Sequence, residues 1–219
     1  MKKYALAISI LAMAALPSAL AKPTTLFSFA SDDNHSYPTF TTGSSGVEIV
    51  NSKGTYDLVV DVNGDYAGGL VTFLTEFEFF GEIRDYALVP CGSNYLHVWK
   101  VKGRFSFTHF NGLFFYPLLQ VEFADAVLTS LSPNSFTLGE TMTLQDSDSV
   151  DPSLLMTTDT LLTAIDVTDA HLAFHEDFAF TFTNIKNLST VDPYQLPRIS
   201  HGQFLEKWSS EGSFSAAGN

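Results

Sequence analysis

Residues 71–83 read VTFLTEFEFFGEI, and residues 99–107 read WKVKGRFSF. In both stretches apolar and polar side chains alternate with a period of two, which is typical of a strand that is buried on one face. The outward positions are acidic in the first stretch and basic in the second: Glu76, Glu78 and Glu82 against Lys100, Lys102 and Arg104. Because opposite charges on neighbouring strands favour one register, we predict that these strands pair with both charged rows on the same outer face.

The same alternation continues through the rest of the chain. Longer strands are expected at 113–123, at 172–182 and, with a bend near Ser209–Gly212, at 204–216. Turn residues separate the strands, and Gly92-Ser93-Asn94 and Phe110-Asn111-Gly112-Leu113 predict hairpins. Shorter strands are expected at 25–29, 39–41, 47–50 and 56–61. We therefore predict an all-β, single-domain fold: an antiparallel β-sandwich, jelly-roll-like or similar.

The N-terminus has the layout of a secretory signal peptide. Met1-Lys2-Lys3 is basic, residues 4–16 are uncharged and mostly apolar, and Ala19-Leu20-Ala21 is a small-x-small cleavage site. The apolar run is shorter than the roughly 20 residues that span a bilayer, so no transmembrane helix is predicted. We predict a signal peptide at 1–21 and one β-rich domain at 22–219, with little helix outside the signal peptide. The expected location is periplasmic, cell-surface or extracellular, in a bacterium.

Composition and charge exclude several classes of protein. The chain has 219 residues, of which 45% are hydrophobic and 16% are charged, and this excludes a disordered chain. With 24 acidic residues against 11 Lys plus Arg, the net charge is −13, so nucleic-acid binding through phosphate contacts is not expected. Cys91 is the single cysteine, which precludes an internal disulfide. We predict that it is a small buried residue; an intermolecular disulfide is the alternative.

An acidic stretch around residues 138–165 departs from the strand pattern. Residues 138–153 resemble a long polar loop. Asp151-Pro152 is a suitable helix start, but the β-branched threonines that follow oppose a helix. The stretch is predicted to be an irregular excursion with at most one helical turn.

Two acidic clusters are candidate calcium sites. The segment Asp61-Val62-Asn63-Gly64-Asp65 resembles the opening of an EF-hand or dockerin loop, in which oxygen side chains converge on a hard cation. It departs from that pattern at Tyr66 and Thr72, where glycine and a carboxylate are expected, and a polar hairpin turn is the competing interpretation. The candidate calcium ligands are Asp61, Asn63 and Asp65 in the first cluster and Asp146, Asp148 and Asp151 in the second. Asp32-Asp33-Asn34-His35 is a further acidic loop.

Other polar and aromatic residues are candidates for metal binding, catalysis or ligand contact. His171 and His175 would lie about 13 Å apart on a strand, too far to share one metal ion, so we interpret them as surface histidines. Glu176 occupies a position between Phe174 and Phe178 where the alternation predicts an inward, apolar side chain. It could be an inward catalytic acid, but we favour a β-bulge that turns its side chain outward. Some aromatic residues occupy hairpin tips or positions where the alternation predicts an outward, polar side chain. They could stack on sugar rings or contact a partner: Phe80, Phe110, Phe114 and Tyr116.

Three functions remain open, since the sequence holds no G-x-S-x-G, P-loop or G-x-G-x-x-G motif. The favoured one is a secreted, non-catalytic β-sandwich protein that serves as a cell-surface or extracellular binding or structural module, with a glycan, the matrix or a surface protein as its partner. The alternative is an outer-membrane β-barrel, although the chain ends without a terminal aromatic residue. A further alternative is a secreted hydrolase acting on polysaccharide. The spacing of Glu76 and Glu78 permits this, but their row continues to Glu82 and faces the basic row, which is typical of a solvated surface with paired charges.

Overall fold

The computed structural model describes residues 24–29, 38–43, 47–51, 55–60, 71–110, 113–145, 153–157, 177–192 and 194–217. Across these ranges the regular secondary structure is β-strand, without a helix. In chain order the strands are β1 (Thr24–Phe29), β2 (Thr39–Thr42), β3 (Glu48–Asn51), β4 (Thr55–Val60), β5 (Val71–Cys91), β6 (Asn94–Phe110), β7 (Phe115–Ser132), β8 (Met142–Gln145), β9 (Ser153–Thr157), β10 (Asp177–Asn187), β11 (Ile199–Ser200), β12 (Gln203–Phe204) and β13 (Trp208–Ala217).

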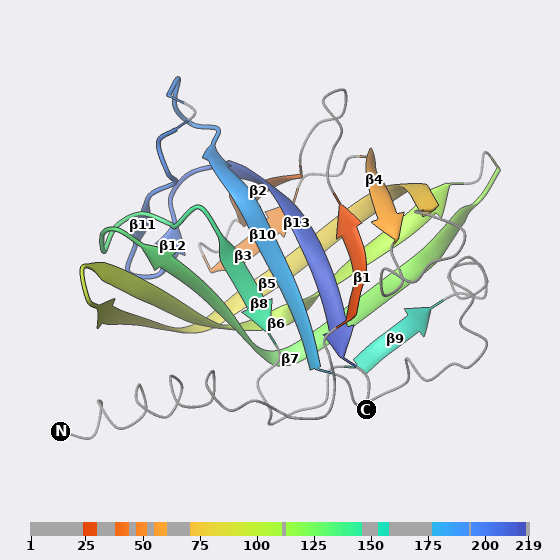
Figure 1. Cartoon of the computed structure of the whole chain (residues 1–219), viewed down its shortest axis with the longest axis horizontal. Helices are drawn as coiled ribbons and strands as arrows, with labels where there is room; N and C mark the ends of the chain where they lie inside the picture. Colours follow the sequence, from red (N-terminus) through yellow and green to blue (C-terminus); the bar gives the residue numbers. More distant parts are fainter. Residues whose placement is uncertain are drawn as a thin grey trace.

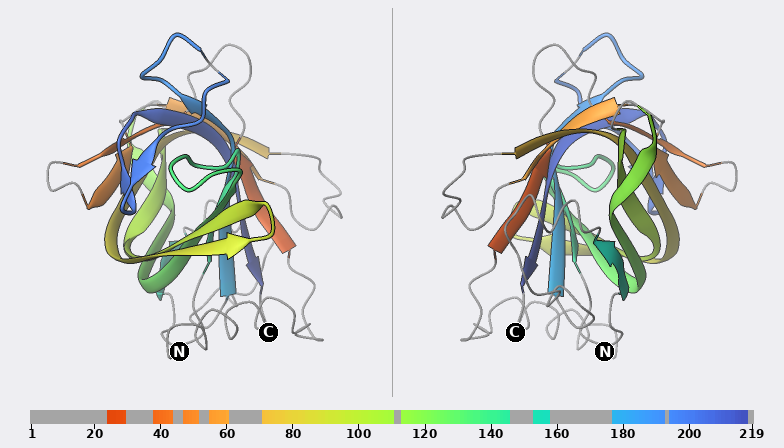
Figure 2. Two further views of the ribbon diagram at one scale, coloured as in Figure 1. Left: turned by 90° about the vertical axis from the view of Figure 1, so that its left-hand side faces the viewer. Right: turned by 90° about the vertical axis from the view of Figure 1, so that its right-hand side faces the viewer.

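Most strands belong to one antiparallel sheet that closes on itself. Its 11 strands run in the order β1-β4-β5-β3-β2-β13-β10-β8-β7-β6, with β9 paired to β7. Each end strand pairs a second time, β1 with β13 and β6 with β5, and β11 and β12 form a separate sheet. Figure 1 shows β10 and β13 crossing in front of β5 and β6, and Figure 2 shows the strands surrounding a common interior. The predicted all-β, antiparallel, sandwich-like, single-domain fold is confirmed, with both layers formed by one continuous sheet.

The pairing of the two decisive stretches is also confirmed. β5 and β6 are antiparallel neighbours, and Glu82 lies opposite Lys102 while Asp85 lies opposite Lys100. Directly opposed residues of an antiparallel pair share a face, so the acidic and basic rows lie together on the outside of the sheet. The register shifts by one residue between Ile83 and Asp85, where a β-bulge changes the alternation of β5.

The short strands and the hairpins lie where the sequence predicts them. β1 to β4 begin and end within one residue of the expected positions. The β5–β6 turn joins Cys91 to Asn94, and Gly92 takes a φ of 63° there, which glycine adopts without strain. β6 and β7 also form a hairpin, but their last pair is Phe110 with Phe115, so four residues separate the strands where the Asn-Gly sequence predicts a two-residue turn.

Aromatic rings from both layers meet in the core. The rings of Phe77 and Phe180 stack with their centroids 5.9 Å apart at 5°. Phe105 contacts Phe180 at 5.0 Å, and Phe79 meets Phe182 edge-on at 5.7 Å. All five side chains are at most 3% exposed. Burial of these large apolar groups drives the two layers together and is the main stabilising contribution in the described interior.

The acidic excursion differs from the prediction because it contains two strands. β8 pairs with both β10 and β7, so residues 142–145 are integral to the sheet instead of belonging to a polar loop. β9 pairs with β7 directly after Asp151-Pro152, which corrects the possible helical turn to a strand. The β-branched and apolar residues favour a strand once β7 offers a free edge. The rest of the excursion lies outside the described residues.

The last strand begins later than predicted, at Trp208 instead of Phe204. β13 is one strand from Trp208 to Ala217, and its register with β10 shifts between Ser209 and Glu211, inside the stretch where a bend is expected. The chain leaves the strand geometry between Phe204 and Trp208, at Leu205–Lys207. At this break the Glu206 carboxylate accepts hydrogen bonds from the Arg198 backbone N–H and the Asn187 side-chain amide.

Candidate functional site

A polar surface covers the outside of β5, β6 and β7. Three successive rows of opposed residues run across these strands, with Glu78 in the first row, Phe80 in the second and Glu82 in the third. Each row continues onto β6, and the first two reach β7. We call the following residues the outer patch: Glu78, Phe80, Glu82, Lys102, Arg104, Gln120 and Glu122.

Phe80 lies in the middle row of the outer patch. It is opposite Arg104 of β6 on one side and Val50 of β3 on the other, and Arg104 is in turn opposite Glu122 of β7. Phe80 and Glu122 are half-buried and Arg104 is exposed. The Gln120 amide donates a hydrogen bond to the Glu122 carboxylate at 3.3 Å. An apolar ring surface is thus flanked by groups that donate or accept hydrogen bonds.

Charge on the outer patch is balanced locally in an acidic protein. Glu82 forms an ion pair with Arg84 at 2.8 Å and lies opposite Lys102. Both partners of the ion pair are partly exposed, so the pair adds little stability. The outer patch therefore presents carboxylates and cationic groups side by side.

A second polar group lies at the end of the molecule that holds the β5–β6 turn. The buried His97 has Nδ1 2.9 Å from the Tyr86 hydroxyl and Nε2 3.3 Å from the Asn134 carbonyl oxygen. A carbonyl only accepts, so in neutral His97 Nε2 carries the proton and the Tyr86 hydroxyl donates to Nδ1. Trp99 stacks on His97 at 5.6 Å and donates its indole N–H to the Gly202 carbonyl at 2.7 Å. These contacts fasten the β5–β6 hairpin to the β11–β12 turn.

Burial sets the protonation of this cluster. Desolvation lowers the pKa of His97 below its usual 6.5 and outweighs the hydrogen bond to Asn134, which raises it. Burial also raises the pKa of the Tyr86 hydroxyl. Both groups therefore stay neutral at neutral pH, as suits a structural hydrogen-bonded pair.

The His97 cluster predicts a loss of stability on acidification. Because the folded state disfavours His97 protonation, the unfolded chain binds more protons below pH 6.5. The free energy of unfolding should be highest above pH 6.5 and fall as the pH drops toward the lowered pKa of the folded state. Urea unfolding at several pH values checks this: His97→Gln should flatten the pH dependence between about pH 7 and 5. An unchanged pH dependence in His97→Gln, or an equal flattening in the exposed control His201→Gln, would contradict it.

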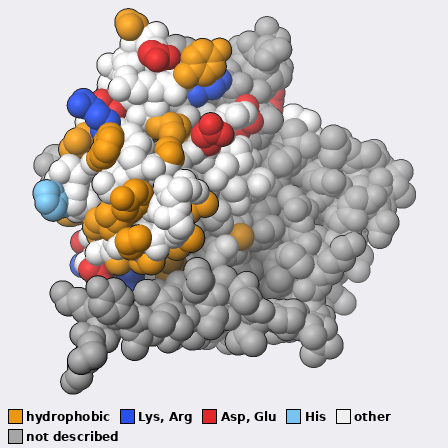
Figure 3. All heavy atoms as spheres, turned by 60° about the vertical axis from the view of Figure 1, so that its left-hand side comes forward, with side chains coloured by type: hydrophobic (Ala, Val, Ile, Leu, Met, Phe, Trp, Pro, Cys, Tyr) orange, Lys and Arg blue, Asp and Glu red, His pale blue; other side chains and the backbone are white. Residues whose placement is uncertain are grey.

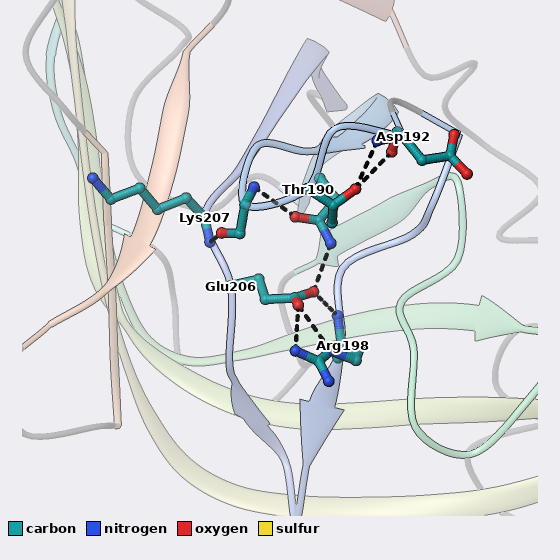
Figure 4. Close-up of polar contacts among 7 residues, drawn as sticks. Thr190, Asp192, Arg198, Glu206 and Lys207 are labelled. Carbon is teal, nitrogen blue, oxygen red and sulfur yellow. Dashed lines mark hydrogen bonds and ion pairs between the residues drawn. The ribbon is translucent and has the colours of Figure 1, made fainter.

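A third polar group, Glu206, shapes the loop that precedes β13. Its Oε2 accepts hydrogen bonds from the Arg198 backbone N–H at 2.8 Å and the Asn187 side-chain amide at 2.6 Å. Its Oε1 accepts one from the Arg198 Nε–H at 2.8 Å (Figure 4). Nearby, the Thr190 hydroxyl donates to the Asp192 carbonyl and accepts from its backbone N–H. The Glu206 side chain is 8% exposed, whereas that of Arg198 is 58% exposed. This arrangement is a structural clamp across the chain segment between β10 and β13.

The Glu206 clamp predicts a second pH effect. Burial raises the pKa of Glu206, but the hydrogen bonds from Arg198 and Asn187 and the Arg198 charge outweigh it, so the pKa lies below its usual 4.5. The clamp thus stabilises the fold above pH 4.5 and loses this contribution as the pH falls through the folded pKa. Glu206→Gln should lower the free energy of unfolding by about 1–3 kcal/mol at neutral pH, and by less in acid. The exposed control Glu140→Gln should change it little; equal effects of the two variants in urea unfolding would refute the clamp.

The candidate calcium ligands lie outside the described residues. This holds for Asp61, Asn63 and Asp65 and for Asp146, Asp148 and Asp151. His171, His175, Glu176 and the acidic loop at 32–35 lie outside them as well. Among the residues that the structure does describe, no group of three or more His, Cys, Asp or Glu side chains could hold a metal ion. Calcium binding therefore stays a prediction.

The prediction for Cys91 is wrong. Its thiol is free and exposed because Cys91 is the last residue of β5, where the hairpin extends beyond the core. Of the aromatic candidates, Phe80 is half-buried on the outer surface and Phe114 is exposed, whereas the side chains of Phe110 and Tyr116 are not described. The Tyr86–His97 pair was missed, although His97 continues the inward row of Trp99 and Val101 by two residues.

Comparisons with known proteins give no relative from which to infer a function. No family model matches the chain, and neither a curated protein nor a solved structure matches it significantly. Within the described ranges, no helix is long and apolar enough to cross a membrane.

Proposed function

We propose that the protein is an exported, non-catalytic binding module that holds a neutral glycan on the outer patch. The observation that carries the proposal is the row Val50–Phe80–Arg104–Glu122. It places a half-buried aromatic ring on the outer face of the sheet, in line with a guanidinium and a carboxylate. The apolar face of a sugar ring packs against an aromatic side chain, and its hydroxyls exchange hydrogen bonds with carboxylate, amide and guanidinium groups.

The interior and the charge support the same proposal. Most described inward positions of β5, β6 and β10 are filled by buried aromatic and aliphatic side chains, and the buried Thr75 and His97 make hydrogen bonds within the protein. This favours ligand contact on the outside of the sheet. The net charge of −13 repels a polyanion and therefore favours a neutral glycan over an acidic one. The sequence-based expectation of a signal peptide would place this surface outside the cytoplasm, where polysaccharides and the matrix are available.

Affinity electrophoresis in gels that contain neutral or acidic polysaccharides tests the proposal. A neutral polysaccharide should retard the mature protein and be recovered with its chain length unchanged. Phe80→Ala should weaken retention at least about tenfold, because aromatic anchors dominate such contacts. Leu74→Ala is the matched control, since Leu74 is also an outward apolar residue of β5, 43% exposed, and lies about 20 Å along the strand. Equal retention of wild type and Phe80→Ala would remove the outer patch as the site.

A further inference from the structure

The turn between β6 and β7 exposes three consecutive large apolar side chains. Leu113 is 80%, Phe114 63% and Phe115 57% exposed, and we call these residues the apolar tip. In Figure 1 the β6–β7 hairpin reaches the end of the molecule opposite the β5–β6 turn. Other phenylalanines of the same two strands are buried: Phe105, Phe107 and Phe123. The exposed side chains of the apolar tip therefore contrast with the buried phenylalanines of the same strands.

The sequence around the apolar tip carries no charge. Residues 110–121 hold no acidic or basic side chain, and no Lys or Arg occurs between Arg104 and Lys186. The opposite end of the molecule differs, because acidic and basic side chains lie among its hydrophobic ones (Figure 3). The chain segment that forms the apolar tip therefore adds no charged side chain of its own, in a chain whose net charge is −13.

Shape and charge together favour one occupant. A hairpin turn is convex, and a lipid surface accepts a convex apolar group without a preformed groove. Residues 105–185 contain no Lys or Arg, and together with the negative net charge this provides no attraction to anionic lipids. A second copy of the chain would carry the same net charge of −13, which opposes self-association. We propose that the apolar tip inserts into the headgroup–acyl boundary of an uncharged, zwitterionic lipid surface and docks the protein there.

Flotation with phosphatidylcholine vesicles tests this docking. The mature protein should float with the vesicles, and about 1 M NaCl, where the Debye length is about 3 Å, should not release it. Adding phosphatidylglycerol at low salt should reduce the bound fraction, because the acidic protein is repelled. The double variant Leu113→Ser/Phe114→Ser should lower the partition coefficient at least about tenfold, since it removes two of the three inserting side chains.

The matched control is Leu88→Ser/Leu131→Ser, which removes two exposed leucines near the β5–β6 turn. It should float like the wild type, and cooperative melting of both double variants should show that they are folded. Docking by the apolar tip is wrong if the wild type stays in the lower fraction or if the tip variant floats as well as the wild type. It is also wrong if the wild type forms a dimer that the tip variant dissociates while vesicles bind neither. Glycan retention by the outer patch is measured separately and is not affected by these outcomes.

Discussion

Phe180→Ala is expected to lower the free energy of unfolding by about 3–5 kcal/mol. Phe180 is fully buried, and its ring contacts Phe77 and Phe105 from the opposite layer and Phe182 at 4.7 Å along its own strand. Truncation removes the apolar group that joins the two layers and leaves a cavity that rigid neighbouring strands cannot close. Urea unfolding of the mature protein, followed by the fluorescence of Trp99 and Trp208, measures the effect.

The control for Phe180→Ala is Leu131→Ala. Leu131 is 50% exposed, so its truncation should change the free energy of unfolding by no more than about 0.5 kcal/mol. A cost below about 1 kcal/mol for Phe180→Ala would mean that the layers are not packed through this ring.

Gly103→Ala should destabilise the protein by about 3 kcal/mol. A Cβ at position 103 would overlap the carbonyl oxygen of Phe80 and would also meet the Phe123 ring at 3.0 Å. Gly103 lies opposite Gly81 on β5, and the register of β6 with β7 shifts between Val101 and Gly103. The glycine pair therefore lets two backbones approach closely where the sheet bends. Because the obstacle is backbone, it cannot be relieved by a side-chain rotation.

Gly92→Ala separates this steric effect from the general cost of replacing glycine. Gly92 has a positive φ of 63° but nothing within 4 Å of the added Cβ, so only the backbone strain of about 1 kcal/mol is expected. Thermal unfolding of both variants gives the comparison. Equal losses in Gly103→Ala and Gly92→Ala would show that close approach at Gly103 is not important.

The strands that alternate strictly could be predicted from the sequence. The period-two alternation of apolar and charged side chains predicts the β5–β6 pair, because successive residues of a strand point to opposite faces of the sheet. The part of β5 after Ile83 could not be predicted in the same way. The bulge between Ile83 and Asp85 exchanges the positions that face inward with those that face outward. β8 and β9 were missed because they are only 4 and 5 residues long and depend on β7 and β10 as partners.

Contacts between distant residues could not be predicted. The hydrogen bond from Trp99 to Gly202 joins residues 103 positions apart, and no local pattern indicates it. The Glu206 clamp spans only 8 positions to Arg198, yet it lies in a segment without regular alternation. The outer patch was partly anticipated, because Phe80 stands on the polar parity between glutamates. Its neighbours Arg104 and Glu122 became evident only with the register of three strands.

Glycan binding at the outer patch is tested most directly by an NMR titration of the isotope-labelled mature protein. The titrant is the neutral oligosaccharide whose polymer gives the strongest retention. The amides of Phe80, Arg104 and Glu122 should shift together and saturate, while those of Leu88 and Leu131 should not move. Shifts that cluster elsewhere, or no shifts with neutral oligosaccharides at millimolar concentration, would contradict a glycan-binding role for this surface.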